Sequence, residues 1–383
     1  MTMEKLLIIS MAGMGNLILS TPLIKNLRND FPKAKITLLV RREFSRAVLK
    51  PGHLINDIVI CNLDLPIFKI FKILLKLRRE RFDMSLTAFP SNRLSYNLIA
   101  FIIAAKMRLT HEYETGKFRT LSFLQNRKVK AIKGIHDVDQ NLNLLKMIDG
   151  RGTAVTKNLV FEVSSTDRDK AGEFLKENGV REGEKLIGLH LSIEDTPNTR
   201  SKNRNVFSSI YDCFGEKYDI DLRKGWDRAN SLVFASIGDY VSKEHDAKVI
   251  LFGGPDELET VKKIKESMNN DAITSLNNSL GMTAELIRRC SLFINTDSGL
   301  GHIAAAMGTP SITIFGFADS SRIKPFHDNA VVVQHDLPCV PCNPYPFSKP
   351  KPRIKCNREF ECMGKIDAQK VVLAIRRLMA EFD

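Results

Sequence analysis

The sequence predicts an α/β protein with two Rossmann-like halves, and three observations support this prediction. Residues 291–316 read as an apolar strand, a polar turn, a helix of small residues and a second apolar strand, which is a β-α-β unit of a parallel sheet. Residues 6–40 show the same order of strand, glycine turn, helix and strand. A chain of 383 residues is also expected to form two domains.

The first half alternates buried strands with helices. Continuous apolar runs predict strands at 6–10 and 36–40, and the segment 17–29 between them reads as a helix with Pro22 near its first turn, where proline is tolerated. Further along we expect a helix at 68–81, a strand at 83–88, a helix at 90–105 and a strand at 106–109. Residues 111–133 are polar, basic and without periodicity, which predicts a loop.

A composition break at 180–185 predicts the boundary between the two halves, giving domains at 1–182 and 183–365. An extended strand at 159–163 and a helix at 164–179 precede this break. The second half is expected to hold a strand at 186–191, a helix at 229–243, a strand at 248–252 and a helix at 283–289. A last helix, within 366–383, alternates apolar and basic residues.

Composition and charge narrow the classes of function. The chain is 43% hydrophobic and 26% charged, as expected of a globular protein with a large core. No apolar run reaches the roughly 18–20 residues that span a bilayer, and the N-terminus shows no cleavable signal pattern, so we expect a cytoplasmic protein. The net charge of +13 indicates an anionic partner or a solvated basic surface. The chain shows no nucleic-acid-binding signature, and a nucleic-acid partner is not expected.

The polar turn at 295–301 is the first candidate site. It leaves the carboxyl end of a strand, where open α/β sheets bind ligands, and it opens a helix whose free N–H groups suit phosphate. Asp297 and Ser298 hold N-cap-like positions, Gly299 and Gly301 let a ligand approach the backbone, and His302 lies in the first helical turn. The alternative is that Asp297 and Ser298 only cap the helix.

The same stretch resembles the signature of glycosyltransferase family 9, the heptosyltransferase family. The match is Asp297-Ser298-Gly299-x-x-His302-x-Ala304-x-Ala306-x-Gly308-x-Pro310, followed by an apolar strand and Phe315-Gly316. The resemblance implies two Rossmann-like domains facing a cleft, the GT-B architecture, with the acceptor side at 1–182 and the donor side at 183–365. It also implies that the helix in 366–383 packs back on the first domain.

The resemblance further implies an inverting transfer of a sugar, heptose, from a nucleoside-diphosphate sugar to a lipopolysaccharide-core or related glycolipid. ADP-heptose is the expected donor, and no cofactor or metal is required. Asp297, Ser298, Gly299 and His302 would then hold the donor. A second glycine turn, at Gly254, leads to Glu257, a candidate for the ribose hydroxyls; the alternative is that Glu257 caps a helix.

Two catalytic positions follow from the same resemblance. Lys224, in Lys224-Gly225-Trp226, matches a Lys-x-Trp motif that contacts the diphosphate, although residues 192–222 intervene as an insertion in which Lys202 is the fallback. The family has an acidic residue, proposed as the general base, where this chain has Asn16. An amide accepts no proton at neutral pH but can orient a hydroxyl.

Asn16 leaves two functions open. Either the chain is a transferase with another base, for which His136, Asp137 and Asp139 are the candidates, or it is a catalytically impaired protein of the same fold that binds a nucleotide sugar or glycan. Each of those three residues can equally be a helix cap or a surface residue.

Two further patterns remain open. The late cysteines Cys339, Cys342, Cys356 and Cys362 have a spacing that can hold a structural zinc, or they carry no metal. The helix at 68–81 places Ile67, Ile70, Phe71, Leu74 and Leu77 on an apolar face opposite Lys69, Lys72, Lys76 and Arg79. Such a helix either covers a sheet with a solvated basic face or lies on the anionic surface of the inner membrane.

Overall fold

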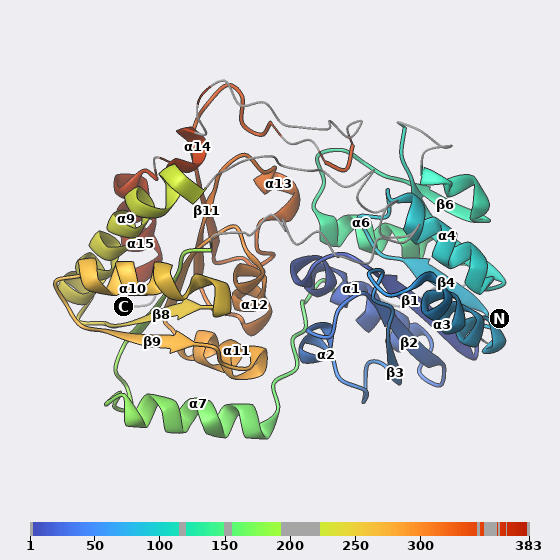
Figure 1. Cartoon of the computed structure of the whole chain (residues 1–383), viewed down its shortest axis with the longest axis horizontal. Helices are drawn as coiled ribbons and strands as arrows, with labels where there is room; N and C mark the ends of the chain where they lie inside the picture. Colours follow the sequence, from blue (N-terminus) through green and yellow to red (C-terminus); the bar gives the residue numbers. More distant parts are fainter. Residues whose placement is uncertain are drawn as a thin grey trace. The chain divides into compact units, whose positions relative to one another are not determined.

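A computed structural model of the chain describes residues 3–114, 120–148, 155–192, 223–342, 345–347, 358, 361–364 and 366–380, and for 223–229 it describes the backbone alone. These residues divide into two compact units (Figure 1). The first unit contains the described residues up to Val160 together with 345–347, and the second contains the others from Phe161 onward. In the described ranges, no helix has the length and apolar character needed to cross a bilayer.

The described part of the first unit is built on a six-stranded parallel sheet in the order β3-β2-β1-β4-β5-β6. Its strands are β1 (Lys5–Ser10), β2 (Lys35–Val40), β3 (Asp57–Ile60), β4 (Met84–Thr87), β5 (Met107–Glu112) and β6 (Arg127–Lys130). This order reverses between β1 and β4, as in Rossmann folds. The central strands are almost fully buried, because a parallel sheet is covered on both faces.

Helices and short 3-10 turns connect these strands. They are α1 (Met14–Asp30), α2 (Ser45–Val48), α3 (Ile67–Arg79), α4 (Leu94–Ile103), η1 (Ser122–Leu124), α6 (Asp137–Asn143) and η2 (Leu144–Met147). α3 and α4 pack together over one face of the sheet, where Ile70 and Ile99 meet Leu7 and Ile9. α1 packs against α6, and the Asn141 amide of α6 donates to the Leu19 carbonyl at 3.3 Å.

A short piece of the distant C-terminal half completes the first unit. The ring of Phe347 lies 6.1 Å from that of Phe89 and 6.1 Å from that of Tyr113. The Tyr345 hydroxyl donates to the side chain of Asn92 at 3.0 Å. Residues 345–347 therefore belong to the first unit, although the described residues before and after them belong to the second.

The second unit repeats the same topology. Its described strands form a six-stranded parallel sheet in the order β12-β11-β10-β7-β8-β9, which reverses between β7 and β10. They are β7 (Leu186–His190), β8 (Lys248–Gly253), β9 (Ala272–Leu276), β10 (Leu292–Thr296), β11 (Ser311–Phe315) and β12 (Ala330–Gln334). The two sheets confirm the prediction of an α/β protein with two Rossmann-like domains.

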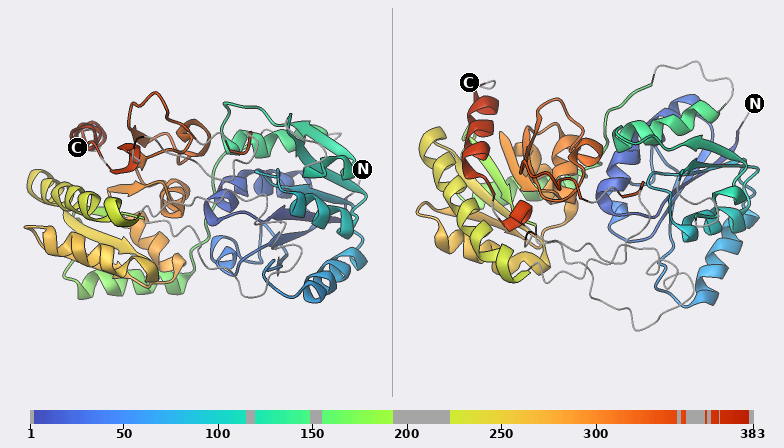
Figure 2. Two further views of the ribbon diagram at one scale, coloured as in Figure 1. Left: turned by 45° about the horizontal axis from the view of Figure 1, so that its top comes forward. Right: turned by 90° about the horizontal axis from the view of Figure 1, so that it is seen from above.

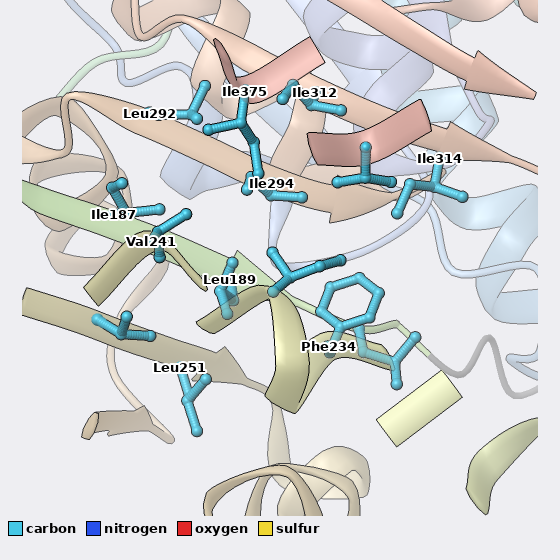
Figure 3. Close-up of a cluster of buried hydrophobic side chains, with 14 of the residues drawn as sticks. Ile187, Leu189, Phe234, Val241, Leu251, Leu292, Ile294, Ile312, Ile314 and Ile375 are labelled. Carbon is cyan, nitrogen blue, oxygen red and sulfur yellow. The ribbon is translucent and has the colours of Figure 1, made fainter. Parts of the chain in front are cut away.

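The helices of the second unit are α7 (Ser165–Glu177), α9 (Arg223–His245), η3 (Pro255–Glu257), α10 (Leu258–Ser267), α11 (Leu280–Arg289), α12 (Gly299–Met307), α13 (Ser320–Ile323), α14 (Glu361–Gly364) and α15 (Ala368–Met379). α9, α10 and α15 cover one face of the sheet. Figure 3 shows this core, in which Phe234 and Val241 of α9 pack on strand residues such as Leu189.

The C-terminal helix corrects one expectation. The structure places α15 on the second unit, not on the first, because Ile375 lies among Leu292, Ile294 and Ile312 of the second sheet (Figure 3). Its Arg376 guanidinium also hydrogen-bonds the hydroxyl of Tyr240 in α9 at 2.9 Å. Figure 2 shows the same helix, in red, beside the second unit.

The boundary between the units lies at Val160, not near residue 182. α7 belongs to the second unit because it packs against α11, and the Ser279 hydroxyl donates to Asp167 of α7 at 2.7 Å. Residues 159–163, expected as a strand, join no sheet; the backbone N–H of Val160 instead donates to the Thr21 hydroxyl at 2.9 Å.

The loop predicted at 111–133 contains β6, an edge strand. Its sequence, Arg-Lys-Val-Lys, shows little apolar character because the strand pairs on one side alone, with β5, and is partly exposed. Residues 115–119 of that predicted loop lie outside the described ranges.

A substitution at Gly188, at the centre of β7, can test the packing of the second sheet. A Cβ atom there would lie 2.7 Å from Cδ2 of Phe293 and 2.9 Å from Cε2 of Phe252. The two rings meet edge to face with centroids 5.6 Å apart, so little room exists for either to move. We expect Gly188→Ala to lower the free energy of unfolding by about 1–3 kcal/mol, as overpacking does, in urea titrations followed by circular dichroism.

Gly172→Ala in α7 is the matched control, because a Cβ there meets no atom within 4 Å. A glycine inside a helix costs about 0.5–1 kcal/mol relative to alanine, so this variant should be as stable as the wild type or more stable. A Gly188→Ala protein that unfolds at the wild-type urea concentration would contradict the packing described for β7.

Candidate functional site

The candidate site lies at the carboxyl edge of the second sheet, where the strand order reverses between β7 and β10. Crossover helices diverge to opposite faces at such a point and leave a crevice that binds ligands in open α/β sheets. The two strand ends are tied together here, because the Ser192 N–H after β7 donates to the Thr296 hydroxyl at the end of β10, at 2.9 Å.

His190, the last residue of β7, connects three elements at this edge. Its Nδ1 lies 3.2 Å from the Ser298 hydroxyl, between β10 and α12. Its Nε2 lies 3.1 Å from the Glu257 carboxylate, in η3 after β8. That carboxylate also accepts the Gly254 backbone N–H at 2.8 Å. We call these four residues the His190 network.

The Glu257 side chain is an ionised acceptor at neutral pH. Burial by itself would raise its pKa, but the hydrogen bond and positive charge of His190, with the Gly254 N–H and Ser192, outweigh burial and lower the pKa to about 2. A carboxylate only accepts, so His190 Nε2 carries a proton. Nδ1 lies against the Ser298 hydroxyl, where a neutral imidazole accepts a hydrogen bond and a charged one donates it.

Ser298 does not cap α12 with its side chain. It holds the N-cap position in an extended conformation, yet its hydroxyl faces His190 and makes no cap hydrogen bond. Of the two readings of this turn, capping by Ser298 is therefore wrong. The N-terminus of α12 is left without a cap from that residue, which suits an anion.

Gly301 has a structural role that differs from the expected one. A Cβ atom at Gly301 would lie 2.6 Å from the Asn295 amide nitrogen, so the glycine lets α12 pack closely on β10. Asn295 is itself fully buried and accepts a hydrogen bond from Thr313 at 3.0 Å. His302 is buried one turn into α12, and Asp297 is partly exposed immediately before it.

The structure therefore brings together Ser298, Glu257 and Gly254 of the predicted donor residues, with Asp297, Gly299 and His302 adjoining them on the same turn and helix. For Glu257, the two alternatives are not exclusive. Its carboxylate does cap η3 through Gly254, and the same oxygen also faces His190.

The other predicted catalytic residues lie in the first unit. Asn16 is half-buried in the first turn of α1. His136 is buried at the N-cap of α6, where its Nδ1 accepts the Val138 N–H at 3.2 Å. A neutral imidazole with Nδ1 so engaged carries its proton on Nε2 and is a donor there. Asp137 is fully buried, and Asp139 pairs with Lys157 at 2.7 Å.

The carboxyl edge of the first sheet is closed by a neutral network. Ser91, after β4, lies 3.2 Å from His111 Nδ1 and donates its backbone N–H to the Tyr113 hydroxyl at 2.9 Å. Burial lowers the pKa of His111 to about 4, against the opposite effect of its hydrogen bond to the Gln140 carbonyl. His111 is therefore uncharged at neutral pH.

Several predicted residues lie outside what the structure describes. Lys224 falls in α9, where the structure describes the backbone alone, and Lys202, Cys356 and the insertion up to residue 222 lie outside the described residues. Within the described ranges, Cys339, Cys342 and Cys362 form no disulfide. Across those same ranges, no three His, Cys, Asp or Glu residues gather as metal ligands would.

His190 is the site residue that the sequence did not reveal. It ends a buried strand, a position that also suits a core histidine, and its partners are 67 and 108 residues away in the sequence. One feature of the sequence could have identified it. His190 is a polar residue at the carboxyl end of a central strand of a predicted parallel sheet, where such sheets bind ligands.

Comparisons with known proteins agree with this fold. Residues 220–351 match the family model described as "Glycosyltransferase family 9 (heptosyltransferase)". Lipopolysaccharide heptosyltransferase 3 of Escherichia coli K12 is 24% identical over 382 residues, covering 96% of this chain and 96% of that protein.

Solved structures share the fold over nearly the whole length. A family 9 glycosyl transferase from Veillonella parvula has a TM-score of 0.73 at 19% identity, covering 99% of this chain and 98% of that one. An E. coli heptosyltransferase with ADP-2-deoxy-2-fluoro heptose has a TM-score of 0.63 at 16% identity, covering 97% and 99%. These comparisons show that the chain is similar to glycosyltransferase family 9, the heptosyltransferase family, whose model matches residues 220–351.

Proposed function

We propose that this chain is an inverting transferase that moves heptose from ADP-heptose to a lipopolysaccharide-core or related glycolipid acceptor. The observation that carries the proposal is the His190 network, which joins the signature turn to the Gly254–Glu257 turn at the reversal point of the second sheet. The full-length similarity to a lipopolysaccharide heptosyltransferase supports the sugar and the acceptor class. So does the shared fold with a heptosyltransferase crystallised with an ADP-heptose analogue.

The donor roles follow from charge. The free N–H groups at the start of α12, from Gly299 onward, face the diphosphate, since a helix N-terminus attracts anions. Carboxylates repel phosphate, so Glu257 and Asp297 accept hydrogen bonds from donor hydroxyl groups instead. Ser298 adds an oxygen that accepts, and His302 lines the same turn.

The reaction is a single displacement. The acceptor oxygen forms a bond to the anomeric carbon on the face opposite the diphosphate, and the bond from that carbon to the diphosphate oxygen breaks. Lys224 neutralises the departing charge, which makes a metal unnecessary. Asn16 orients the acceptor hydroxyl without taking its proton, and that proton passes to solvent water as the new bond forms. His136 is not assigned as the base, because its Nε2 already carries a proton.

Asn16 also supports a second candidate, a protein of the same fold that binds the nucleotide sugar without transferring it. Both candidates share the donor site and differ only in the transfer step. For the transferase, we place the reaction at the cytoplasmic face of the inner membrane, where a glycolipid acceptor is held.

The nucleotide preference of the donor site can be measured as the increase in Tm that each nucleotide causes. A ligand that binds the folded state alone raises stability by about 2.7 kcal/mol when present at 100 times its Kd. We expect ADP to raise Tm more than UDP, GDP or NAD at equal concentration, and we expect Asp297→Ala to abolish that increase.

Asp271→Ala is the matched control for that substitution. Its side chain is 93% exposed and precedes β9, at the opposite edge of the sheet. The variant should keep the full response to ADP. An Asp297→Ala protein with unchanged ADP affinity would overturn the assignment of the donor site.

The His190 network should act as one unit in nucleotide binding. We expect His190→Gln and Glu257→Gln each to weaken ADP binding, and the double variant to be little weaker than either single one. Contacting residues of this kind show coupling energies of about 0.5–3 kcal/mol in double-mutant cycles. Isothermal titration calorimetry with ADP measures all four proteins.

Glu259→Gln provides the control for that cycle, because this carboxylate is exposed on α10, two residues beyond Glu257. It should bind ADP as the wild type does. Strictly additive losses at His190 and Glu257 would show that the imidazole does not position the carboxylate.

Asn16 should affect transfer and not donor binding, because it lies in the other unit. We expect Asn16→Ala to lower kcat by at least about tenfold through loss of acceptor positioning, with ADP affinity unchanged. The assay is release of ADP from ADP-heptose with a lipopolysaccharide-core acceptor. If the wild type gives no transfer and Asn16→Asp does, the non-catalytic candidate replaces the transferase.

A further inference from the structure

The segment at 345–347 combines an apolar anchor with a hydrogen-bonding group. The ring of Phe347 lies 6.1 Å from that of Phe89, inside the aromatic cluster of the first unit. Tyr345 is half-buried, and its hydroxyl donates to Oδ1 of Asn92 at 3.0 Å. A single hydrogen bond between neutral groups adds only modestly to stability. The apolar contacts therefore explain why the segment is held in the first unit, and the hydroxyl of Tyr345 calls for a second explanation.

Asn92 lies next to the point where the strand order of the first sheet reverses. It follows β4, and the neighbouring strand β1 leads through a glycine turn to Asn16 in α1. The two turns are tied together, because the Tyr96 hydroxyl of α4 donates to the Met11 carbonyl after β1 at 3.1 Å. Open parallel sheets bind ligands at such a reversal. Asn16 and Asn92 therefore belong to the same edge of one unit.

The two turns at this edge carry no charged side chain. Residues 11–16 and 89–92 contain no Asp, Glu, Lys or Arg. Each turn instead has one half-buried amide, at Asn16 and at Asn92. An amide both donates and accepts hydrogen bonds and so complements a sugar hydroxyl, whereas phosphate and carboxylate groups pair most strongly with cations. This chemistry fits the neutral hydroxyl groups of a carbohydrate.

The Tyr345 hydroxyl determines which atoms of the Asn92 amide can bind a ligand. Because Oδ1 accepts from Tyr345, the remaining polar atom is Nδ2, with its two N–H donors. The described residues supply no partner for these donors. Asn92 is thus a hydrogen-bond donor whose orientation is set by a residue from the C-terminal half of the chain.

We propose that Asn92 donates a hydrogen bond to a neutral sugar hydroxyl of the acceptor, and that Tyr345 is the positioning residue that orients Asn92. The inference rests on the proposed transferase function and adds two specificity-determining residues to it. Asn16 orients the hydroxyl that reacts, and Asn92 binds another hydroxyl of the same acceptor. Recognition at this edge then depends on uncharged hydrogen bonds.

The test is isothermal titration calorimetry of the full chain with a lipopolysaccharide-core oligosaccharide at saturating ADP. Asn92→Asp keeps the oxygen that accepts from Tyr345 and removes both N–H donors, so we expect its Kd to be roughly three- to tenfold higher than that of the wild type. Tyr345→Phe removes the hydroxyl alone and should raise Kd roughly two- to fivefold. The double variant should bind no more weakly than Asn92→Asp, because Tyr345 acts through Asn92.

Salt dependence separates loss of the donors from charge repulsion. Repulsion between a new carboxylate at position 92 and an anionic oligosaccharide would be screened as salt increases, whereas the loss of a neutral hydrogen bond would not. We therefore expect the weaker binding of Asn92→Asp to persist at high salt. A loss that disappears there overturns the proposal.

Kinetics and stability separate positioning from a purely structural role. In transfer assays, Asn92→Asp and Tyr345→Phe should raise the acceptor KM and leave the KM for ADP-heptose unchanged. Tm without ligand should stay close to the wild-type value for Tyr345→Phe. A Tyr345→Phe protein that loses stability and keeps its acceptor affinity overturns the positioning role.

Matched controls come from the second unit. Tyr240→Phe removes a hydroxyl that accepts from the Arg376 guanidinium at 2.9 Å. Asn178→Asp changes an amide whose Nδ2 donates to the Phe174 carbonyl at 2.8 Å. Both controls should bind the oligosaccharide as the wild type does.

The outcomes distinguish this inference from the proposed function. Calorimetry needs no sugar transfer, so it also applies if the chain binds its ligands without transferring the sugar. Wild-type affinity in both Asn92→Asp and Tyr345→Phe overturns this inference and leaves the transferase in place. Strictly additive losses would show that Tyr345 does not act through Asn92. A wild type that binds ADP and no core oligosaccharide contradicts the proposed acceptor class itself, and this inference with it.

Discussion

The site depends on one imidazole held between a hydroxyl and a carboxylate. His190 sits where the strand order reverses, so its two ring nitrogens reach the ends of both neighbouring strands. Because Glu257 is ionised and Nε2 must donate to it, the orientation of the ring and the direction of the Ser298 hydroxyl are set together. The Ser298 side chain therefore does not cap α12. A single strand-end residue thereby fixes the positions of two turns that are far apart in the sequence.

The two units share a strand order but use the same edge in different ways. In the first unit, Ser91, His111 and Tyr113 fill the edge with buried groups that are neutral at physiological pH. In the second unit, the edge holds a partly accessible carboxylate and a helix start without a serine cap. The first arrangement packs the edge with buried side chains, and the second leaves hydrogen-bonding groups partly accessible. The topology accounts for where both clusters lie, and the side chains account for what each can do.

Local patterns predicted most of the fold and part of the site. The apolar runs of β1, β7 and β10 and the turn at 297–302 were recognisable because strand, turn and helix follow one another in the sequence. His190 was not recognised, because its role depends on the register of three strands. The unit boundary was misplaced for a similar reason, since the contact of Asp167 with Ser279 assigns α7 and spans 112 residues.

Because residues 345–347 belong to the first unit, they affect when that unit can complete its fold during synthesis. Tyr345 and Phe347 pack on Asn92, Phe89 and Tyr113, so the N-terminal unit draws on a segment synthesised after all the strands of the C-terminal one. During translation, the first unit therefore emerges from the ribosome before Phe347 can pack against Phe89 and Tyr113. The N-terminal unit is therefore complete only after residues 345–347 have been synthesised, and a fragment ending at residue 160 would lack the ring of Phe347 against Phe89 and Tyr113.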